Sequence, residues 1–247
     1  MKIGIMDSGI GGLTVLKECL KQMPNHEYFY YADSLNAPYG TKSKEEVYDL
    51  TKNAVDFLIE KGSEIIVLAC NTATGAAVNT LRQIYKIPII GMEPAIKPAI
   101  ELANGKKVLV TATELTLKQD KFLDLLQTID SKNIVDNVGL SELVILAESG
   151  EFNKELIKEV IKNKLAHRNL NEYGSVVLGC THFPLYKDEF MSIFPQSTHI
   201  VDGTIGTTNR IKNFITSEST KSILKLYRSG EELTSGAHYE LIMNILN

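Results

Sequence analysis

The sequence contains few cysteines, no excess of positive charge and no long apolar run. Its three cysteines are Cys19, Cys70 and Cys180, and none are spaced as CxxC, so we expect free thiols in a reducing compartment rather than disulfides. Lysine and arginine number 26 against 30 aspartates and glutamates, a net charge of −4 that lacks the basic excess typical of nucleic-acid-binding proteins. No apolar run approaches the ~18 residues of a membrane-spanning helix.

The N-terminal segment does not resemble a signal peptide, because its short apolar stretch leads directly into glycines. The composition is 44% hydrophobic and 23% charged, which is ordinary for a globular protein. The 247 residues are enough for one large domain or two smaller ones with a sizeable core. We therefore expect a cytoplasmic globular protein with neither nucleic-acid nor membrane partners.

Strand-like and helix-like segments alternate along the chain. Short apolar runs predict strands over residues 1–6, 28–31, 65–69, 88–92, 107–110, 175–178 and 223–227. Amphipathic spacing predicts helices over residues 13–23, 43–61, 73–85, 115–126, 153–165, 187–194, 207–215 and 239–246, the second of them opened by a capping box at 43–46. The alternation is typical of βαβ units and predicts an α/β fold with mostly parallel sheets.

The second half of the chain repeats the pattern of the first. Residues 107–110 resemble residues 2–5. Residues 176–182 resemble residues 66–72, where an apolar strand likewise ends in a small residue, a cysteine and a polar residue. We therefore predict two similar, pseudo-symmetric α/β domains with the active site in the cleft between them. Their predicted bounds are 1–95 plus 204–247 for the first domain and 96–203 for the second.

Polar side chains follow several of the predicted strands. Open α/β sheets form their sites beyond the carboxyl ends of the strands, so these side chains are candidates for chemistry. They are Asp7, Ser8, Asp33, Ser34, Cys70, Asn71, Thr72, Thr113, Thr116, Cys180, Thr181 and His182.

Cys70 and Cys180 each end an apolar strand and precede polar residues. A helix N-terminus after Cys70 lowers the pKa of a thiol, which favours a reactive one. Two thiols that face each other across a cleft can remove a proton from one side of a carbon and return one from the other. Such a pair inverts a stereocentre without a cofactor, with Asp7 and His182 as polar partners of the thiols. Cys19 lies inside an amphipathic helix, and we expect it only to pack there.

Three other interpretations are weaker. Residues 9–12 resemble a dinucleotide-binding loop with Asp33 as the ribose ligand, but Thr14 stands where the third glycine of that motif belongs. Cys180 and His182 supply two ligands for zinc and no motif supplies the others, so we expect neither a metal nor another cofactor. A hydrolase that uses Cys180 and His182 would leave Cys70 unexplained.

Taken together, the motifs resemble the aspartate/glutamate racemase family, and within it the glutamate racemase branch. The matching segments occur in family order over nearly the whole chain, at residues 7–14, 31–34, 37–40, 42–43, 70–74, 112–116, 148–150, 179–184 and 201–202. Each motif alone has moderate specificity, whereas the full set is highly specific.

This resemblance implies cofactor-independent interconversion of L- and D-glutamate, with D-glutamate supplied for peptidoglycan synthesis, by a homodimer. It implies that Cys70 and Cys180 are the catalytic thiols, the first serving D-glutamate and the second L-glutamate. It also implies catalytic roles for Asp7, His182 and Glu148. The positions that match substrate contacts are Asp7, Ser8, Pro38, Tyr39, Gly40, Asn71, Thr72, Thr113, Thr116, Thr181 and His182.

Two alternatives remain open on the sequence. One is a racemase for aspartate or another amino acid; His182 and the loop at residues 38–40 favour glutamate over it. The other is an amino-acid- or nucleotide-binding module without activity, against which the two retained thiols and their partners argue.

Overall fold

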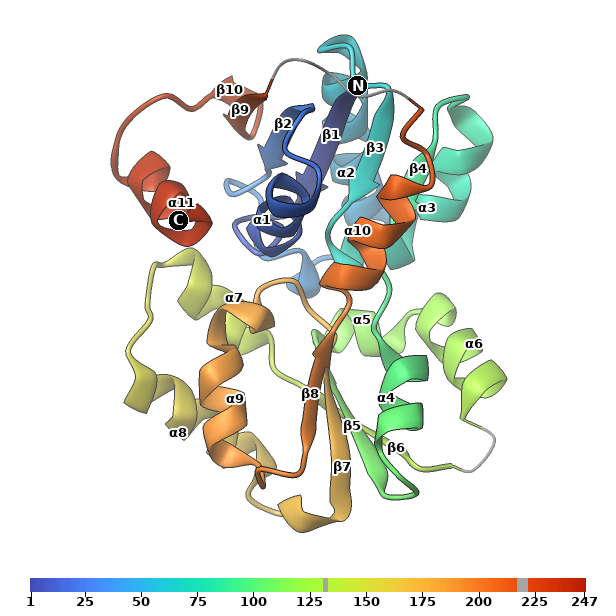
Figure 1. The fold of residues 1–247 in the computed structure, drawn as a ribbon, viewed down its shortest axis with the longest axis vertical. Coiled ribbons are helices and arrows are strands. Elements are labelled where there is room, and N and C mark those ends of the chain that lie inside the picture. The colour runs from blue at the N-terminus through green and yellow to red at the C-terminus, as the bar shows by residue number, and fades with distance from the viewer. Residues whose placement is uncertain (131–132, 217–221) are drawn as a thin grey trace.

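The computed structural model describes residues 1–130, 133–216 and 222–247. Within this part of the chain the strands form one sheet of six strands and one of four. Figure 1 shows the two sheets stacked along the long axis of the molecule, each with its own helices. We call the six-stranded sheet with the helices packed on it lobe 1, and the four-stranded sheet with its helices lobe 2.

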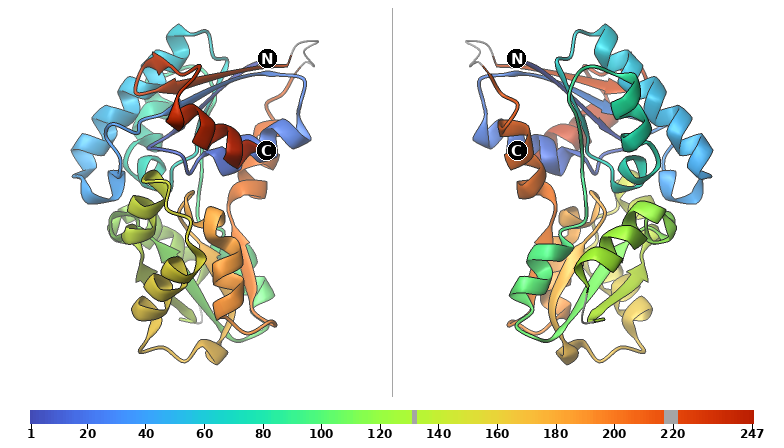
Figure 2. Two further views of the ribbon diagram at one scale, coloured as in Figure 1. Left: turned by 90° about the vertical axis from the view of Figure 1, so that its left-hand side faces the viewer. Right: turned by 90° about the vertical axis from the view of Figure 1, so that its right-hand side faces the viewer.

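Lobe 1 contains both chain termini, as the side views in Figure 2 show. Its elements are β1 (Lys2–Asp7), α1 (Leu13–Gln22), β2 (Glu27–Ala32), η1 (Tyr39–Thr41), α2 (Lys44–Glu60), β3 (Ile65–Leu68), α3 (Asn71–Ile84), β4 (Ile89–Gly91), α10 (Thr204–Lys212), β9 (Ile223–Arg228), β10 (Glu231–Glu232) and α11 (Ala237–Leu246).

Lobe 2 is built from the middle of the chain. Its elements are α4 (Ile96–Leu102), β5 (Lys107–Ala112), α5 (Glu114–Lys118), α6 (Asp120–Ile129), β6 (Val135–Gly139), α7 (Ser141–Glu148), α8 (Lys154–Leu165), η2 (Leu170–Glu172), β7 (Tyr173–Leu178), η3 (Phe183–Tyr186), α9 (Lys187–Ile193) and β8 (His199–Asp202). The chain therefore enters lobe 2 after β4 and returns to lobe 1 after β8.

The topology of the two sheets confirms the predicted repeat. Lobe 1 has the strand order β10-β9-β2-β1-β3-β4 and lobe 2 has the order β6-β5-β7-β8, so β2-β1-β3-β4 corresponds to β6-β5-β7-β8. All of these corresponding neighbours are parallel. Cys70 follows β3 and Cys180 follows β7, the third strand of each set. The C-terminal tail returns to lobe 1 as predicted, because β9 pairs in parallel with β2.

Buried apolar side chains on both faces of the lobe 1 sheet hold its helices in place. Along β1, Ile3 and Ile5 pack on the side of α1, α10 and α11, whereas Met6 packs on the side of α2 and α3. Each such side chain contributes about 1.5–3 kcal/mol when fully buried. The capping box of α2 forms as predicted, with Ser43 and Glu46 each accepting from the backbone of the other.

The structure differs from the sequence-based expectation in the first part of lobe 2. One helix was expected over 115–126, but α5 ends at Lys118 and α6 begins at Asp120 because Gln119 between them is extended, with φ −73° and ψ 139°. Sequence patterns also missed β6, in which the polar Asp136 and Asn137 break the apolar run. No helix among the described residues has the length and hydropathy needed to cross a membrane.

Candidate active site

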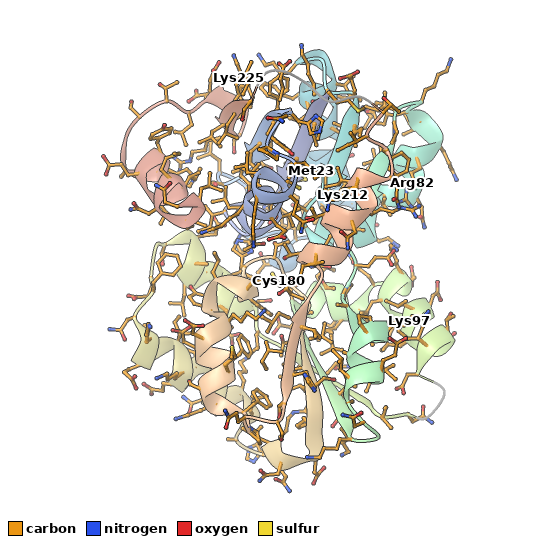
Figure 3. All side chains as sticks on the ribbon, in the orientation of Figure 1. Met23, Arg82, Lys97, Cys180, Lys212 and Lys225 are labelled. Atoms are coloured by element: carbon orange, nitrogen blue, oxygen red, sulfur yellow. The ribbon has the colours of Figure 1, made fainter. Side chains whose placement is uncertain are left out.

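The carboxyl ends of β1 and β3 in lobe 1 meet those of β5 and β7 in lobe 2, where the two lobes touch. Cys180, labelled in Figure 3, lies at this junction. The predicted site residues are nearly inaccessible: Cys70 is 4% exposed and Cys180 is 7% exposed. Also buried there are Asp7, Ser8, Tyr39, Asn71, Thr72, Thr113, Thr116, Thr181 and His182. The lobes are thus closed over these residues, and a substrate must part them to enter.

Cys70 is the N-cap of α3, and its sulfur lies between two polar groups. The Sγ accepts from the backbone N–H of Ala73 at 3.4 Å and donates to Ser8 Oγ at 3.6 Å. Burial, together with the charge of Asp7, raises the pKa of the Cys70 thiol to about 12. The N–H of Ala73 at the helix N-terminus does lower the pKa of Cys70 as expected, but in this closed state desolvation outweighs it and the net shift is upward.

Cys180 lies in a chain of polar contacts that ends on lobe 1. Its Sγ lies 3.7 Å from Nδ1 of His182, whose Nε2 lies 2.6 Å from Glu148 Oε1. The same oxygen of Glu148 accepts from the backbone N–H of Ile10 in lobe 1 at 2.7 Å. Burial alone lowers the pKa of His182, but Cys180 and Glu148 outweigh it and hold this pKa well above 6.5. The imidazolium can therefore donate to both of its neighbours.

Asp7, at the end of β1, is fully buried. Its Oδ2 accepts from the N–H of Gly9 and its Oδ1 accepts from Thr181 Oγ1 of lobe 2, both at 3.1 Å. Burial raises the pKa of Asp7 to about 6, although the positive charge of His182 opposes the rise. Asp7 influences Cys70 through its charge, and among the described residues no hydrogen bond joins the two side chains.

Gly9 and Gly11 allow lobe 2 side chains to approach the backbone of lobe 1. A Cβ built at Gly9 would lie 1.8 Å from Glu148 Oε1, and one at Gly11 would lie 2.4 Å from His182 Nδ1. These glycines therefore serve the contact between the lobes. Asp33 accepts from the Tyr39 hydroxyl at 2.7 Å, which occupies the carboxylate that a dinucleotide-binding loop would need for the ribose.

Three threonine hydroxyls form a triangle across the junction. Thr72 Oγ1 lies 3.1 Å from both Thr113 Oγ1 and Thr116 Oγ1, and these two are 2.9 Å apart. Each hydroxyl has one proton to donate, so the triangle uses all three donors internally. In this closed form the threonines hold the lobes together, and a bound carboxylate would have to draw a donor out of the triangle.

Asn71, the first residue of α3, is the conspicuous unsatisfied group of the site. It is 5% exposed, and neither its Nδ2 nor its Oδ1 has a hydrogen-bond partner. Buried amides are nearly always hydrogen-bonded, so this one is available to a ligand or an ordered water. In lobe 1, Pro38 is the N-cap of η1, and Gly40 in that turn packs on Thr113 of lobe 2. No group of three His, Cys, Asp or Glu side chains in the described ranges could hold a metal ion.

Two residues of the junction were not singled out from the sequence. Gln119 of lobe 2 donates through Nε2 to the backbone carbonyl of Thr72 at 3.0 Å. The backbone N–H of Ile10 donates to Glu148, a contact that the residue types of the glycine motif do not reveal. For the contact of Gln119 with α3, the sequence offered one signal, which is the unusual glycine at residue 75 inside a helical pattern.

Comparison with known proteins agrees with this geometry. Residues 3–209 match the family model described as Asp/Glu/Hydantoin racemase. A glutamate racemase of Halothermothrix orenii is 49% identical over 222 residues, which cover 90% of this chain and 88% of the relative. Glutamate racemase 2 of Bacillus subtilis is 46% identical over 217 residues, which cover 87% of this chain and 82% of the relative.

Solved structures agree as well. A structure of Escherichia coli glutamate racemase in complex with L-glutamate and the activator UDP-MurNAc-ala has a TM-score of 0.85 at 28% identity, over 99% of this chain and 93% of that one. Glutamate racemase from Aquifex pyrophilus has a TM-score of 0.78 at 30% identity, over 100% of this chain and 95% of that one. The match to the family model over most of the chain, together with relatives nearly half identical in sequence, shows that the protein belongs to the Asp/Glu/Hydantoin racemase family.

Proposed function

We propose that this protein interconverts L- and D-glutamate by two-thiol proton transfer at the α-carbon, without a cofactor. The observation that carries the proposal is the pair of buried thiols at corresponding strand ends of the two lobes, with Cys180 close enough for its charge to raise the pKa of Cys70. The names of the relatives support glutamate as the substrate.

In the proposed reaction, one thiolate takes the α-proton and the electron pair stays on the substrate, delocalised into its α-carboxylate. The opposite thiol then delivers its own proton to the other face of the α-carbon, so its sulfur becomes the thiolate for the reverse direction. The resemblance assigns Cys70 to D-glutamate and Cys180 to L-glutamate. The ammonium group of the substrate brings a positive charge beside Cys70, which lowers the high pKa of that thiol.

Each thiol has its own helper in this scheme. His182, held by Glu148, lies at the sulfur of Cys180 and can exchange a proton with it. Ser8 Oγ accepts a hydrogen bond from the Cys70 thiol, and Asp7 acts on that thiol through its charge. The two sides are therefore chemically different, although their strands correspond.

Substrate carboxylates would be bound by neutral donors. The unpartnered side-chain amide of Asn71, at the first turn of α3, is a donor at the junction. We propose that Ser8, Thr181 and the threonine triangle of residues 72, 113 and 116 supply the other contacts, together with the Pro38–Gly40 loop.

The test is a racemization assay on purified protein, with pyridoxal phosphate removed and a metal chelator present. We expect either enantiomer of glutamate to be converted to the racemate, and in deuterated water the D product from L-glutamate to carry deuterium at the α-carbon. Aspartate in parallel tests the alternative substrate. Activity that disappears in chelator and returns with a metal, or that appears only with aspartate, would contradict the proposal.

The remaining parts of the proposal concern the cell and the assembly. We propose that the protein acts in the cytoplasm, supplies D-glutamate for peptidoglycan synthesis, and forms a homodimer. We also propose that its two lobes are domains with bounds near 1–95 plus 204–247 and 96–203. Sedimentation at working concentration should give a dimer. A monomer at that concentration would refute the homodimer and leave the other proposals standing.

A further inference from the structure

Gln119 lies in the break between α5 and α6, where lobe 2 meets the first turn of α3. Its side chain is only 5% exposed, although glutamine is usually a surface residue. Its Nε2 donates to the carbonyl oxygen of Thr72 at 3.0 Å. Between described residues, no other hydrogen bond reaches the backbone of α3 from lobe 2. Gln119 is thus the direct link from lobe 2 to the main chain of this helix.

Gly75, one turn further along α3, is complementary to Gln119. A Cβ built at Gly75 would lie 1.6 Å from Gln119 Oε1, so a glycine is what leaves room for the amide. Glycine is unfavourable inside a helix relative to alanine, and its presence here is explained by this close approach. The amide therefore lies close against α3, where it also makes its hydrogen bond to Thr72.

The turn that Gln119 contacts is the turn that carries Cys70. The sulfur of Cys70 is held by the N–H of Ala73, so a shift of this turn moves the sulfur. The side chain of Thr72 is bonded to Thr113 and Thr116, and Gln119 adds a bond to its carbonyl. The backbone and the side chain of this turn are then both tied to lobe 2.

We propose that Gln119 is a positioning residue for one half of the reaction, setting the approach of Cys70 to the substrate α-carbon. Cys180 follows β7 and contacts His182. Neither Cys180 nor His182 hydrogen-bonds to the Gln119 side chain. The inference rests on the proposed racemase function. It predicts that loss of the Gln119 amide slows proton transfer at Cys70 and leaves the transfer at Cys180 unchanged.

Isotope effects separate the two transfers. Two enantiomers have equal free energies, so any variant must lower kcat/KM equally in both directions, and that ratio alone cannot locate the damage. With α-deuterated D-glutamate the label is removed by the thiol that serves D-glutamate, and with α-deuterated L-glutamate by the other. A slower step at Cys70 therefore raises the isotope effect on kcat/KM for D-glutamate and lowers it for L-glutamate.

The variant is Gln119→Met, which keeps the volume and removes the donor. We expect kcat/KM to fall about 5- to 20-fold, with the two isotope effects moving in opposite directions as described. Gly75→Ala displaces the same amide from the other side and should change both isotope effects with the same signs. Gln127→Met, on the exposed face of α6, is the matched control and should behave as wild type.

Cys70→Ser calibrates the measurement, because its slower step lies at residue 70 and shows which enantiomer reports on that position. Unchanged isotope effects in Gln119→Met and Gly75→Ala, or changes opposite in sign to those of Cys70→Ser, would overturn the inference while leaving the racemase function intact. Wild-type protein without racemization would overturn the proposed function itself, and the inference with it.

Discussion

At the scale of single residues, the two thiols of the junction have unlike surroundings. Cys70 lies against a hydroxyl and a backbone N–H, and burial holds its pKa near 12. Cys180 lies against an imidazole that is itself bonded to a carboxylate. Proton transfer on the two faces of a substrate is thus assisted by different groups. A substitution can therefore slow the transfer at one thiol without slowing the transfer at the other.

Both thiols should be required for turnover. Serine is a far weaker acid than cysteine, so Cys70→Ser and Cys180→Ser should each lower kcat by at least the ~10²–10⁴-fold that a positioned acid or base supplies. Cys19→Ser is the control, because Cys19 is buried in α1 and its Sγ lies 3.8 Å from Thr208 Oγ1 of α10, another lobe 1 helix. Near-normal racemization by either of the first two variants would remove the two-thiol mechanism.

Asp7 should make stability depend on pH. Its pKa is raised from an ordinary 3.8 to about 6, so the folded protein binds this proton more tightly than the unfolded chain does. The contribution of Asp7 to the free energy of unfolding is then most favourable below pH 3.8 and is lost as the pH rises through 6. Between pH 4 and pH 7, the stability of wild type relative to Asp7→Asn should fall by about 2 kcal/mol. Urea unfolding at several pH values measures this, and a constant difference would contradict the assignment.

At the scale of elements, α8 depends on a single N-cap. The side chain of Asn153 accepts from the N–H groups of Glu155 and Leu156, both at 3.1 Å. Alanine at an N-cap costs about 1 kcal/mol, so Asn153→Ala should lower the free energy of unfolding by that amount. Asn153→Asp keeps the acceptor and should stay near wild type. Neither change should alter kcat, and a loss of turnover in both would indicate a role beyond capping.

At the scale of the whole molecule, the contact between the lobes depends on backbone atoms that lack side chains. A Cβ at Gly11 would lie 2.4 Å from His182 Nδ1 and 2.7 Å from the backbone nitrogen of His182. Gly11→Ala must therefore separate the lobes or displace the imidazole. Displacements near 1 Å can cost 10²-fold, so kcat/KM should fall by about that factor.

Gly206→Ala is the matched control for Gly11→Ala. Gly206 lies in α10, and a Cβ there would meet nothing within 4 Å. Alanine should stabilise the helix by about 0.5–1 kcal/mol and leave turnover unchanged. Thermal unfolding and the racemization assay, run on both variants, compare the two glycines directly. Equal activity of the two variants would show that close approach at Gly11 is not needed.

Local patterns in the sequence determined the α/β class, the repeat and the set of residues at the junction. Apolar runs and helical spacing depend on neighbouring residues, so they predicted most of the strands and helices to within a few residues. Parallel strands bring their carboxyl ends to one edge of a sheet, and the polar residues after β1, β3, β5 and β7 were therefore expected to gather. That expectation needed no knowledge of distances.

Only the tertiary structure decided how these residues are held. The contacts of Glu148 with the N–H of Ile10 and of Gln119 with the carbonyl of Thr72 join segments far apart in the chain, and a backbone atom carries no residue-specific signal. The break at Gln119 interrupts an otherwise continuous helical pattern. The high pKa of Cys70 arises from burial by the closed lobes, which a helix N-terminus read from the sequence cannot reveal.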